Sequence, residues 1–339
     1  MGNQSYEYAM GRVRAVERRM LDRARLERMI EAGSAEDALH VLREAEYGGA
    51  FANSVTDARE YESMLEAEGA KLAAFISEIS PEPGLLNIFL LRFDYHNIKV
   101  LLKSEFAGKT GGGQLSSSGI VPPAKLAQTV RERTFSDLPA EMAAGTARAI
   151  QDFRQSVSAR APDPQIIDIR LDQAMYAQMR REARDLRNPF IERLICIYID
   201  VANIGAFLRM RHMGKNVDFL LDALIPGGAI ERSLLARCAQ DGLDAFIGAM
   251  QYTQYAVLCE TGVKDFQATG LMTVFERCAD DYINTYIKKA KLFSAGLEII
   301  AAYFVARQTE MKNVRIAMVG KINGIAQDVI RERLRECFV

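Results

Sequence analysis

The sequence predicts an all-α protein built from three related helical units. Apolar residues recur at three- and four-residue spacing over long stretches, whereas the alternating pattern of half-buried strands is nearly absent. A short motif, carboxylate-x-x-Asn, also occurs three times at nearly even spacing. Self-similarity at a fixed period is typical of repeat architectures. The 339 residues provide enough chain for a large core or for two or three domains.

The periodic stretches predict the long helices. Between residues 60 and 80 the apolar positions are Tyr61, Met64, Leu65, Leu72, Phe75 and Ile76, which places them on one helical face. Similar patterns over residues 166–187 and 271–291 predict two further long helices.

The repeated motif divides the chain into units. Its copies are Asp94-x-x-Asn97, Asp200-x-x-Asn203 and Glu310-x-x-Asn313. The second carboxylate follows the first by 106 residues, and the third follows the second by 110. Upstream of each copy lies an apolar–acidic pair, in the order Leu65-Glu66, Leu171-Asp172 and Phe275-Glu276. Each unit is therefore predicted to be a helix hairpin with the motif on its second long helix.

Two breaks fall between the motif copies. Residues 108–123 are rich in Gly, Ser and Pro, and Ile225-Pro226-Gly227-Gly228 forms the second break. They predict helical repeat units at residues 1–115, 116–227 and 228–339. No role is assigned to the Gly/Ser loop at residues 108–119.

The motif asparagines are expected to be buried. On a helix, Asn97 falls on a stripe with Phe89, Phe93 and Leu101, and Asn203 and Asn313 have similar surroundings. A buried amide without partners costs about 1–3 kcal/mol, so these side chains should be hydrogen-bonded to backbone groups. The carboxylates lie on the flank of the same face, where they can hold an Arg, a Lys or a helix N-terminus. We favour a structural role for Asp94, Asn97, Asp200, Asn203, Glu310 and Asn313; a ligand or catalytic site in each unit is the alternative.

Composition excludes several classes of protein. The net charge of −1 gives no electrostatic case for binding nucleic acid. Apolar runs such as residues 299–306 are far shorter than the ~20 residues of a membrane-spanning helix, and no secretory signal is present. Five cysteines without a CxxC pair indicate reduced thiols in a cytoplasmic protein.

No residue pattern indicates a reaction, a cofactor or a metal. Gly108-Lys109-Thr110 ends like a phosphate loop, but Lys103 occupies the position of the glycine that the loop requires. The three histidines are not at metal-ligand spacing. Carboxylate chemistry remains open, because 44 acidic residues offer too many pairs to choose among. An arginine cluster at residues 180–193 is interpreted as a solvated helix face, with contact to an acidic partner or to lipid headgroups as the alternative.

Five stretches follow one another in order along nearly the whole chain: Tyr47-Gly48-Gly49, residues 90–97 around Asp94 and Asn97, Leu171-Asp172, residues 199–203, and residues 300–315. In these stretches the chain resembles the C subunit of the archaeal and bacterial V/A-type rotary ATPases, whose eukaryotic counterpart is the d subunit. Each motif alone is weakly specific, whereas the ordered set is strongly so.

The resemblance implies a funnel of three helical units around a pseudo-threefold axis. It implies a non-catalytic rotor adaptor, a monomer when isolated, on the cytoplasmic face of the membrane. There the protein would join the central-shaft subunits to the membrane rotor ring and transmit torque. Lys103, Arg209 and Arg211, which follow the motif helices, are the predicted partner contacts. A helical scaffold of another complex and an unrecognised all-α carboxylate enzyme are the alternatives. The transported ion and the direction of operation lie outside what this sequence determines.

Overall fold

The computed structural model describes residues 5–49, 55, 57–108 and 115–339. All regular secondary structure in these described residues is helical, which confirms the all-α prediction. The chain forms two compact units, which we call the split unit (Met1–Pro83 with Leu243–Val339) and the central unit (Gly84–Gly242). The division into three units at residues 1–115, 116–227 and 228–339 remains a prediction.

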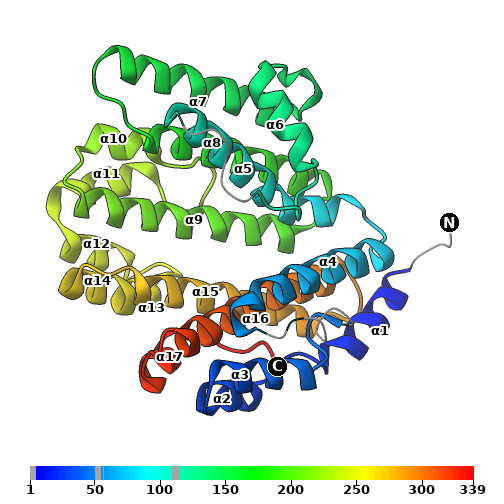
Figure 1. Cartoon of the computed structure of the whole chain (residues 1–339). Helices are drawn as coiled ribbons and strands as arrows, with labels where there is room; N and C mark the ends of the chain where they lie inside the picture. Colours follow the sequence, from blue (N-terminus) through cyan, green and yellow to red (C-terminus); the bar gives the residue numbers. More distant parts are fainter. Residues whose placement is uncertain (1–4, 50–54, 56, 109–114) are drawn as a thin grey trace. The chain divides into compact units, whose positions relative to one another are not determined.

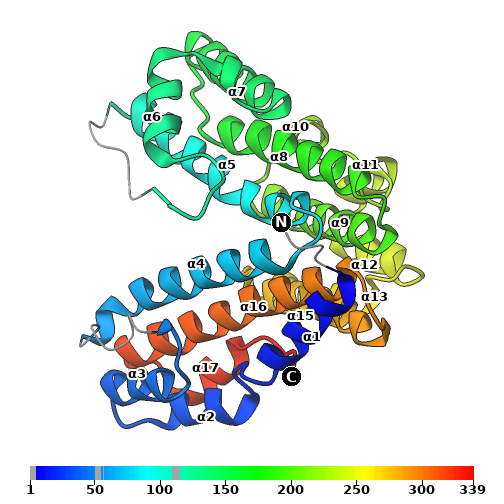
Figure 2. The same ribbon diagram turned by 90° about the vertical axis from the view of Figure 1, so that its right-hand side faces the viewer.

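The split unit is organised around its longest helix, α16, Leu297–Ile322. Among the described residues, the α-helices of the unit from the first part of the chain are α1 Tyr6–Glu17, α2 Arg23–Glu31, α3 Ala35–Glu44 and α4 Tyr61–Ile79. The others come from the last part: α12 Leu243–Met250, α13 Ala256–Leu258, α14 Lys264–Thr269, α15 Thr273–Lys288 and α17 Gln327–Arg333. Helix α16 packs against α1, α2, α3, α4, α15 and α17. Figures 1 and 2 both show α4 beside α16, although more than 200 residues separate them along the chain.

Helix α16 is buried on nearly all sides, and its sequence explains why this is possible. Ala301, Ala302 and Ala306 are each at most 1% exposed, and such small side chains allow neighbouring helices to approach closely. Ile300 and Phe304 fill the space between these contacts, since both are almost fully buried. The motif residues Glu310 and Asn313 lie on this helix, in the interior of the unit.

The central unit has α8 in its middle. Its helices are α5 Gly84–Phe106, α6 Pro123–Glu132, α7 Ala140–Ser158, α8 Gln165–Asp185, α9 Pro189–His212, α10 Val217–Ala223 and α11 Arg232–Asp241. Helix α8 packs against α5, α7 and α9. The rings of Phe106 and Phe153 stack at 4.3 Å between centroids and join α5 to α7.

Local sequence fixes where the helices that flank the motifs begin. Asn188 accepts a hydrogen bond from the N–H of Ile191, and Pro189 occupies the first position of α9. Asp22 caps α2 in the same way through the N–H of Arg25, and Asn216 caps α10.

The prediction of which apolar residues share the buried face with Asn97 is wrong in detail. Phe93 and Leu101 are only half-buried, whereas Ile88, Leu91, Tyr95 and Ile98 are at most 1% exposed. Helix α5 contacts α6, α7 and α8, so its buried side is wider than a single stripe and is centred elsewhere.

Candidate functional site: three carboxylate–asparagine motifs

Each motif asparagine makes the same pair of hydrogen bonds to one backbone residue. Asn97 accepts from the N–H of Ser116 at 2.8 Å and donates to its carbonyl at 2.8 Å. Asn203 does the same with Ile225, at 2.8 and 2.9 Å, and Asn313 with Arg335, at 2.8 and 3.0 Å. The three amides are at most 3% exposed, so these bonds satisfy groups that water cannot reach. The shared geometry clamps each long helix to a later segment of the chain, which follows α5 in the first copy, α10 in the second and α17 in the third.

The first two carboxylates bind the same loops a few residues further on. Asp94 accepts from the N–H groups of Ile120 and Val121 at 3.0 and 3.1 Å. Asp200 accepts from Ala229 and Ile230, both at 3.0 Å. In both copies the two donors lie immediately before a helix, α6 or α11.

A glycine precedes the donors in both loops, and its missing side chain makes the contact possible. A Cβ atom on Gly119 would lie 2.1 Å from Asp94 Oδ1, and one on Gly228 would lie 2.0 Å from Asp200 Oδ1. Neither separation is physically tolerable, so the carboxylate approaches the backbone only because no Cβ is there. The Gly/Ser loop therefore has a structural role in its described part, residues 115–119. Residues 109–114 lie outside the described part of the chain.

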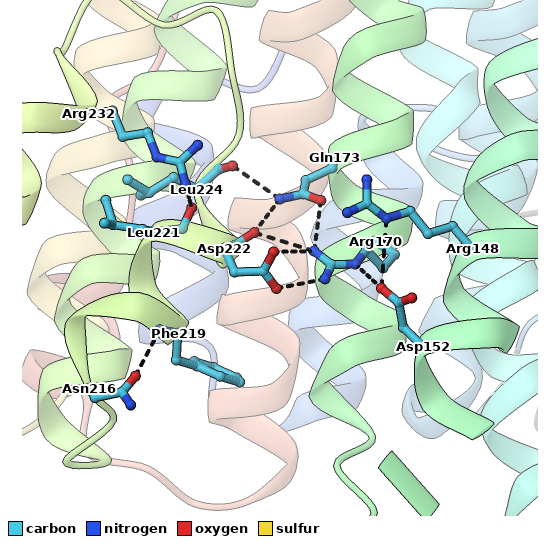
Figure 3. A network of polar contacts seen from close by, with 10 residues as sticks. All are labelled: Arg148, Asp152, Arg170, Gln173, Asn216, Phe219, Leu221, Asp222, Leu224 and Arg232. Atoms are coloured by element: carbon cyan, nitrogen blue, oxygen red, sulfur yellow. Dashed lines mark hydrogen bonds and ion pairs between the residues drawn. The ribbon is translucent and has the colours of Figure 1, made fainter. Parts of the chain in front are cut away.

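An ion-pair network holds the second loop in place (Figure 3). Arg170 of α8 lies between Asp152 of α7, at 2.6 Å, and Asp222 of α10, at 2.7 Å. Gln173 donates to the carbonyl groups of Asp222 and Leu224 at 2.6 and 3.1 Å. These bonds fix the end of α10 directly before Ile225, the partner of Asn203.

The third carboxylate has different partners. Glu310 accepts a hydrogen bond at 2.7 Å from the N–H of Leu21, 289 residues away in the sequence. Its other oxygen forms an ion pair with Arg307, one turn earlier on α16. The guanidinium of Arg307 also pairs with Glu68 of α4. All three charged residues are at most 6% exposed.

Residues just after α3 complete this buried cluster. The N–H of Gly48 donates to Glu68 at 2.8 Å, and the Tyr47 ring lies 5.3 Å from the Arg307 guanidinium carbon. A cavity of about 370 Å³ opens beside Glu68, Arg307 and Tyr47. At the level of the sequence, Tyr47-Gly48-Gly49 contributes only to the family resemblance. No sequence pattern distinguishes Arg307 or Glu68 from the other charged residues.

Burial shifts the titration of these groups. It raises the pKa of Glu310 to about 7, against the opposing effect of Arg307. Burial is the largest single influence on Arg307 and would lower its pKa, but the electrostatic effects of Glu310, Tyr47, Tyr303 and Glu68 together outweigh it, and the pKa is raised. In the first motif copy, burial raises the pKa of Asp94 to about 6, although two backbone N–H groups oppose the shift.

The basic residues two positions after the asparagines also have defined partners. Lys99 pairs with Asp172 at 2.6 Å, and Arg315 pairs with Glu62 at 2.7 Å. The second copy has Gly205 at this position, and it is buried in α9. The copies therefore share their backbone clamps but differ in their salt bridges.

The three predicted partner contacts lie in different surroundings. Lys103 pairs with Asp168 at 2.6 Å, and Arg211 donates to the carbonyl of Ala239. Arg209 is exposed on α9. Their proposed role in partner binding stays a prediction.

Among the described residues, no cluster of three or more His, Cys, Asp or Glu side chains is arranged to hold a metal ion. None of the helices in the described ranges is both long enough and apolar enough to cross a bilayer.

Comparison with known proteins shows the family. The family model "ATP synthase (C/AC39) subunit" matches residues 9–333. The C subunit of the V-type sodium ATPase of Enterococcus hirae is 22% identical, over 96% of this chain and 97% of its own length. The C subunits of the A-type ATP synthases of Methanocaldococcus jannaschii and Thermococcus kodakarensis are each 24% identical, over 97% and 98% of this chain and 86% and 90% of their own lengths. The chain belongs to the ATP synthase (C/AC39) subunit family and is a non-catalytic subunit of a V/A-type ATPase.

Proposed function

We propose that the protein is the central-rotor adaptor of its ATPase, a socket that receives the central shaft and joins it to the membrane rotor ring. The observation that carries the proposal is the family match, which extends over residues 9–333 and matches relatives along nearly their whole length. In this role the protein transmits torque, while ATP hydrolysis and ion transfer take place in other subunits.

The hydrogen-bond clamps support a mechanical role. An adaptor that passes torque must resist shear between its helices, and directional bonds to buried backbone resist sliding better than apolar contacts alone. Each of α5, α9 and α16 is tied to a loop through an asparagine with two such bonds. Three equal clamps, at nearly equal spacing in the sequence, also support three related helical units, which we propose form a funnel around a pseudo-threefold axis. That arrangement suits a part centred on a rotation axis.

The proposed partners are the central-shaft subunits and the membrane ring, and the proposed location is the cytoplasmic face of the membrane. The Enterococcus hirae relative carries sodium in its name, whereas the archaeal relatives are named without an ion. The ion of this complex is left open, because its binding site would lie in another subunit.

Arg209 and Arg211, near the end of α9, are the proposed contacts to test first. Arg209 is exposed and Arg211 is half-buried. Reversing both charges should weaken assembly by replacing attraction to an acidic partner surface with repulsion. The matched control reverses the charges of Arg154 and Arg160, two exposed residues of the central unit that lie on α7 and just after it.

A pull-down from native membranes in mild detergent tests the proposal. The tagged protein should bring down the shaft subunits and the ring protein together, as identified by mass spectrometry. The Arg209→Glu/Arg211→Glu variant should recover less of both, and the Arg154→Glu/Arg160→Glu variant should match the wild type. Recovery of the protein alone, or with an unrelated set of soluble partners, would contradict the adaptor role and favour a scaffold of another complex.

A further inference from the structure

The link that precedes α16 is longer than the links that precede the other two motif helices. Residues 80–83 join α4 to α5, and residues 186–188 join α8 to α9. Residues 289–296 join α15 to α16. Two consecutive helices can be joined by as few as about two residues, so chain connection alone does not require a link of this length. We call residues 289–294 of this link the tip.

The tip holds two adjacent apolar side chains out in solvent. Leu292 is 88% exposed and Phe293 is 41% exposed. Both belong to an ordered turn: Lys289–Leu292 form the 3₁₀ helix η5, and Ala290 within it is buried. The N–H of Phe293 closes the turn by donating to the carbonyl of Ala290 at 3.2 Å. Large apolar residues held outward side by side indicate an interaction surface.

The exposed lysines of the tip contact only neutral groups in the contacts that hold them. Lys291 Nζ donates to the carbonyl of Phe338 at 2.8 Å and lies 4.5 Å from the centre of the Phe338 ring. Lys289 Nζ lies 5.4 Å from the centre of the Tyr286 ring. A carbonyl group and an aromatic ring attract an ammonium group without cancelling its charge. Both lysines therefore present positive charge beside Leu292.

The acidic residues around the tip do not balance this charge. Glu336 is paired with Lys288 at 3.1 Å, and Glu17 of α1 is paired with Arg14 at 2.8 Å. Glu298, in the first turn of α16, is the one acidic residue between positions 286 and 298, a stretch that contains three lysines. The tip thus combines an exposed apolar pair with an excess of positive charge.

Other exposed apolar side chains of the split unit have different surroundings. Tyr252 is 92% exposed and Val257 is 78% exposed, but residues 251–258 contain no charged residue. Apolar groups in an uncharged polar setting give no electrostatic reason to prefer one kind of partner. Lysines beside an exposed leucine and phenylalanine do give one, because the surface of an anionic bilayer offers phosphate groups directly above an apolar phase.

We propose that the tip is a lipid contact of this protein. Leu292 and Phe293 enter the boundary between the headgroups and the acyl chains of an anionic bilayer, and Lys289 and Lys291 bind the phosphate groups of the phospholipids. Apolar burial and electrostatic attraction add to one another in shallow binding of this kind. The proposal goes beyond the adaptor role, in which the protein reaches the membrane through the rotor ring and needs no contact with lipid.

Tryptophan fluorescence of the full-length protein tests the proposal. The chain contains no tryptophan, so a single introduced one reports only on its own surroundings. Leu292→Trp is mixed with vesicles of phosphatidylcholine alone, or of phosphatidylcholine and phosphatidylglycerol in equal parts. With the anionic vesicles we expect emission at shorter wavelength and quenching by lipids brominated on their acyl chains, and with neutral vesicles a smaller effect. Tyr252→Trp, at an exposed position of the same unit, is the matched control and should show neither effect.

Flotation with anionic vesicles separates the two parts of the interaction. Lys289→Gln removes one positive charge near the membrane surface and should weaken binding about fivefold. Leu292→Ser removes the most exposed apolar group of the tip and should weaken binding about tenfold. Lys264→Gln, at an exposed lysine of α14, should bind as tightly as the wild type. These side chains are exposed, so the substitutions disturb little packing.

Three results would overturn the lipid contact. The first is Leu292→Trp emission that anionic vesicles do not change. The second is an equal shift in Tyr252→Trp, which would show unspecific adsorption. The third is a shift that appears only when the membrane ring protein is added in detergent, which would assign the tip to a protein partner. The vesicles contain no other subunit, so failure here leaves the pull-down of shaft and ring subunits as a separate test of the adaptor role.

Discussion

The side-chain amide of Asn203 and the backbone of Ile225 form a closed two-way pair, in which each residue donates one hydrogen bond and accepts another, at 2.9 and 2.8 Å. Asn97 with Ser116 and Asn313 with Arg335 repeat this pair in the other motif copies. An asparagine suits the task because one flat amide presents a donor and an acceptor side by side. No apolar residue of similar size can satisfy both backbone groups.

Replacing Asn203 by Leu should destabilise the protein and prevent assembly. The substitution leaves the N–H and C=O of Ile225 buried without partners, at about 1–3 kcal/mol each, so the free energy of unfolding should fall by about 2–6 kcal/mol. Urea unfolding measures the change. Asn323→Leu, at an exposed position just after α16, is the matched control and should cost less than about 1 kcal/mol. A wild-type melting temperature together with a lost ligand would instead favour a binding site at the motif.

Alanine substitutions at two glycines should have opposite signs. At Gly228 a Cβ would lie 2.0 Å from Asp200 Oδ1, so Gly228→Ala must displace the loop and should cost about 1–3 kcal/mol. Gly69, in the interior of α4, has no atom within 4 Å of an added Cβ, and Gly69→Ala should stabilise the protein by about 0.5–1 kcal/mol. Thermal unfolding of both variants measures the two changes in stability. Equal effects would mean that the close approach of Asp200 to its loop is not maintained in solution.

Removing Arg307 should be far more damaging than removing an exposed arginine of the same helix. Arg307→Met leaves Glu68 and Glu310 buried without their shared cation, which should cost about 3–5 kcal/mol near neutral pH. Arg315→Met breaks a half-exposed pair with Glu62 and should cost about 1 kcal/mol or less. Chemical denaturation at pH 7.5 measures both. Costs of similar size would show that the Arg307 cluster is open to water.

Asp94 should contribute a pH dependence with a defined sign. Its pKa is raised from 3.8 to about 6 by burial, so the folded state binds this proton more tightly than the unfolded chain does. The contribution of Asp94 to stability is therefore present below pH 4 and is lost as the pH rises to about 6, by about 3 kcal/mol at most. Asp94→Asn should remove this slope from a plot of unfolding free energy against pH. A slope that persists unchanged in the variant would place its origin in another group.

The helices and the burial of the motif were predictable because both follow from local spacing. Apolar periodicity predicts α4, α8 and α15, and an asparagine inside such a periodic stretch must be buried and bonded. The loop partners carry a signal as well, since Gly119 follows Asn97 by 22 residues and Gly228 follows Asn203 by 25. From the sequence, the two loops are interpreted as unit boundaries; the role of these glycines depends on the absent Cβ atoms, which only the structure shows.

Other parts could not be predicted from this one sequence. Nothing near Leu21 marks it as the donor to Glu310, because a backbone N–H can come from almost any residue. Arg307 and Glu68, which form an ion pair, lie 239 residues apart in the sequence. The chain has 43 basic and 44 acidic residues, so the sequence alone offers a very large number of other possible pairs. Such contacts arise from how α4 and α16 pack. Apolar periodicity predicts which face of a helix is buried, but it does not predict which helix packs against that face.

The adaptor role is tested most directly by removing the protein from its membrane complex and restoring it. In membranes from cells that lack this chain, we expect the ring to remain in the membrane while the shaft and ATPase activity are found in the soluble fraction, so that ATP no longer drives ion transport. Adding the wild-type protein back should return the ATPase activity to the membrane and restore transport. ATPase activity that stays membrane-bound and still drives ion transport without this chain would contradict the adaptor role.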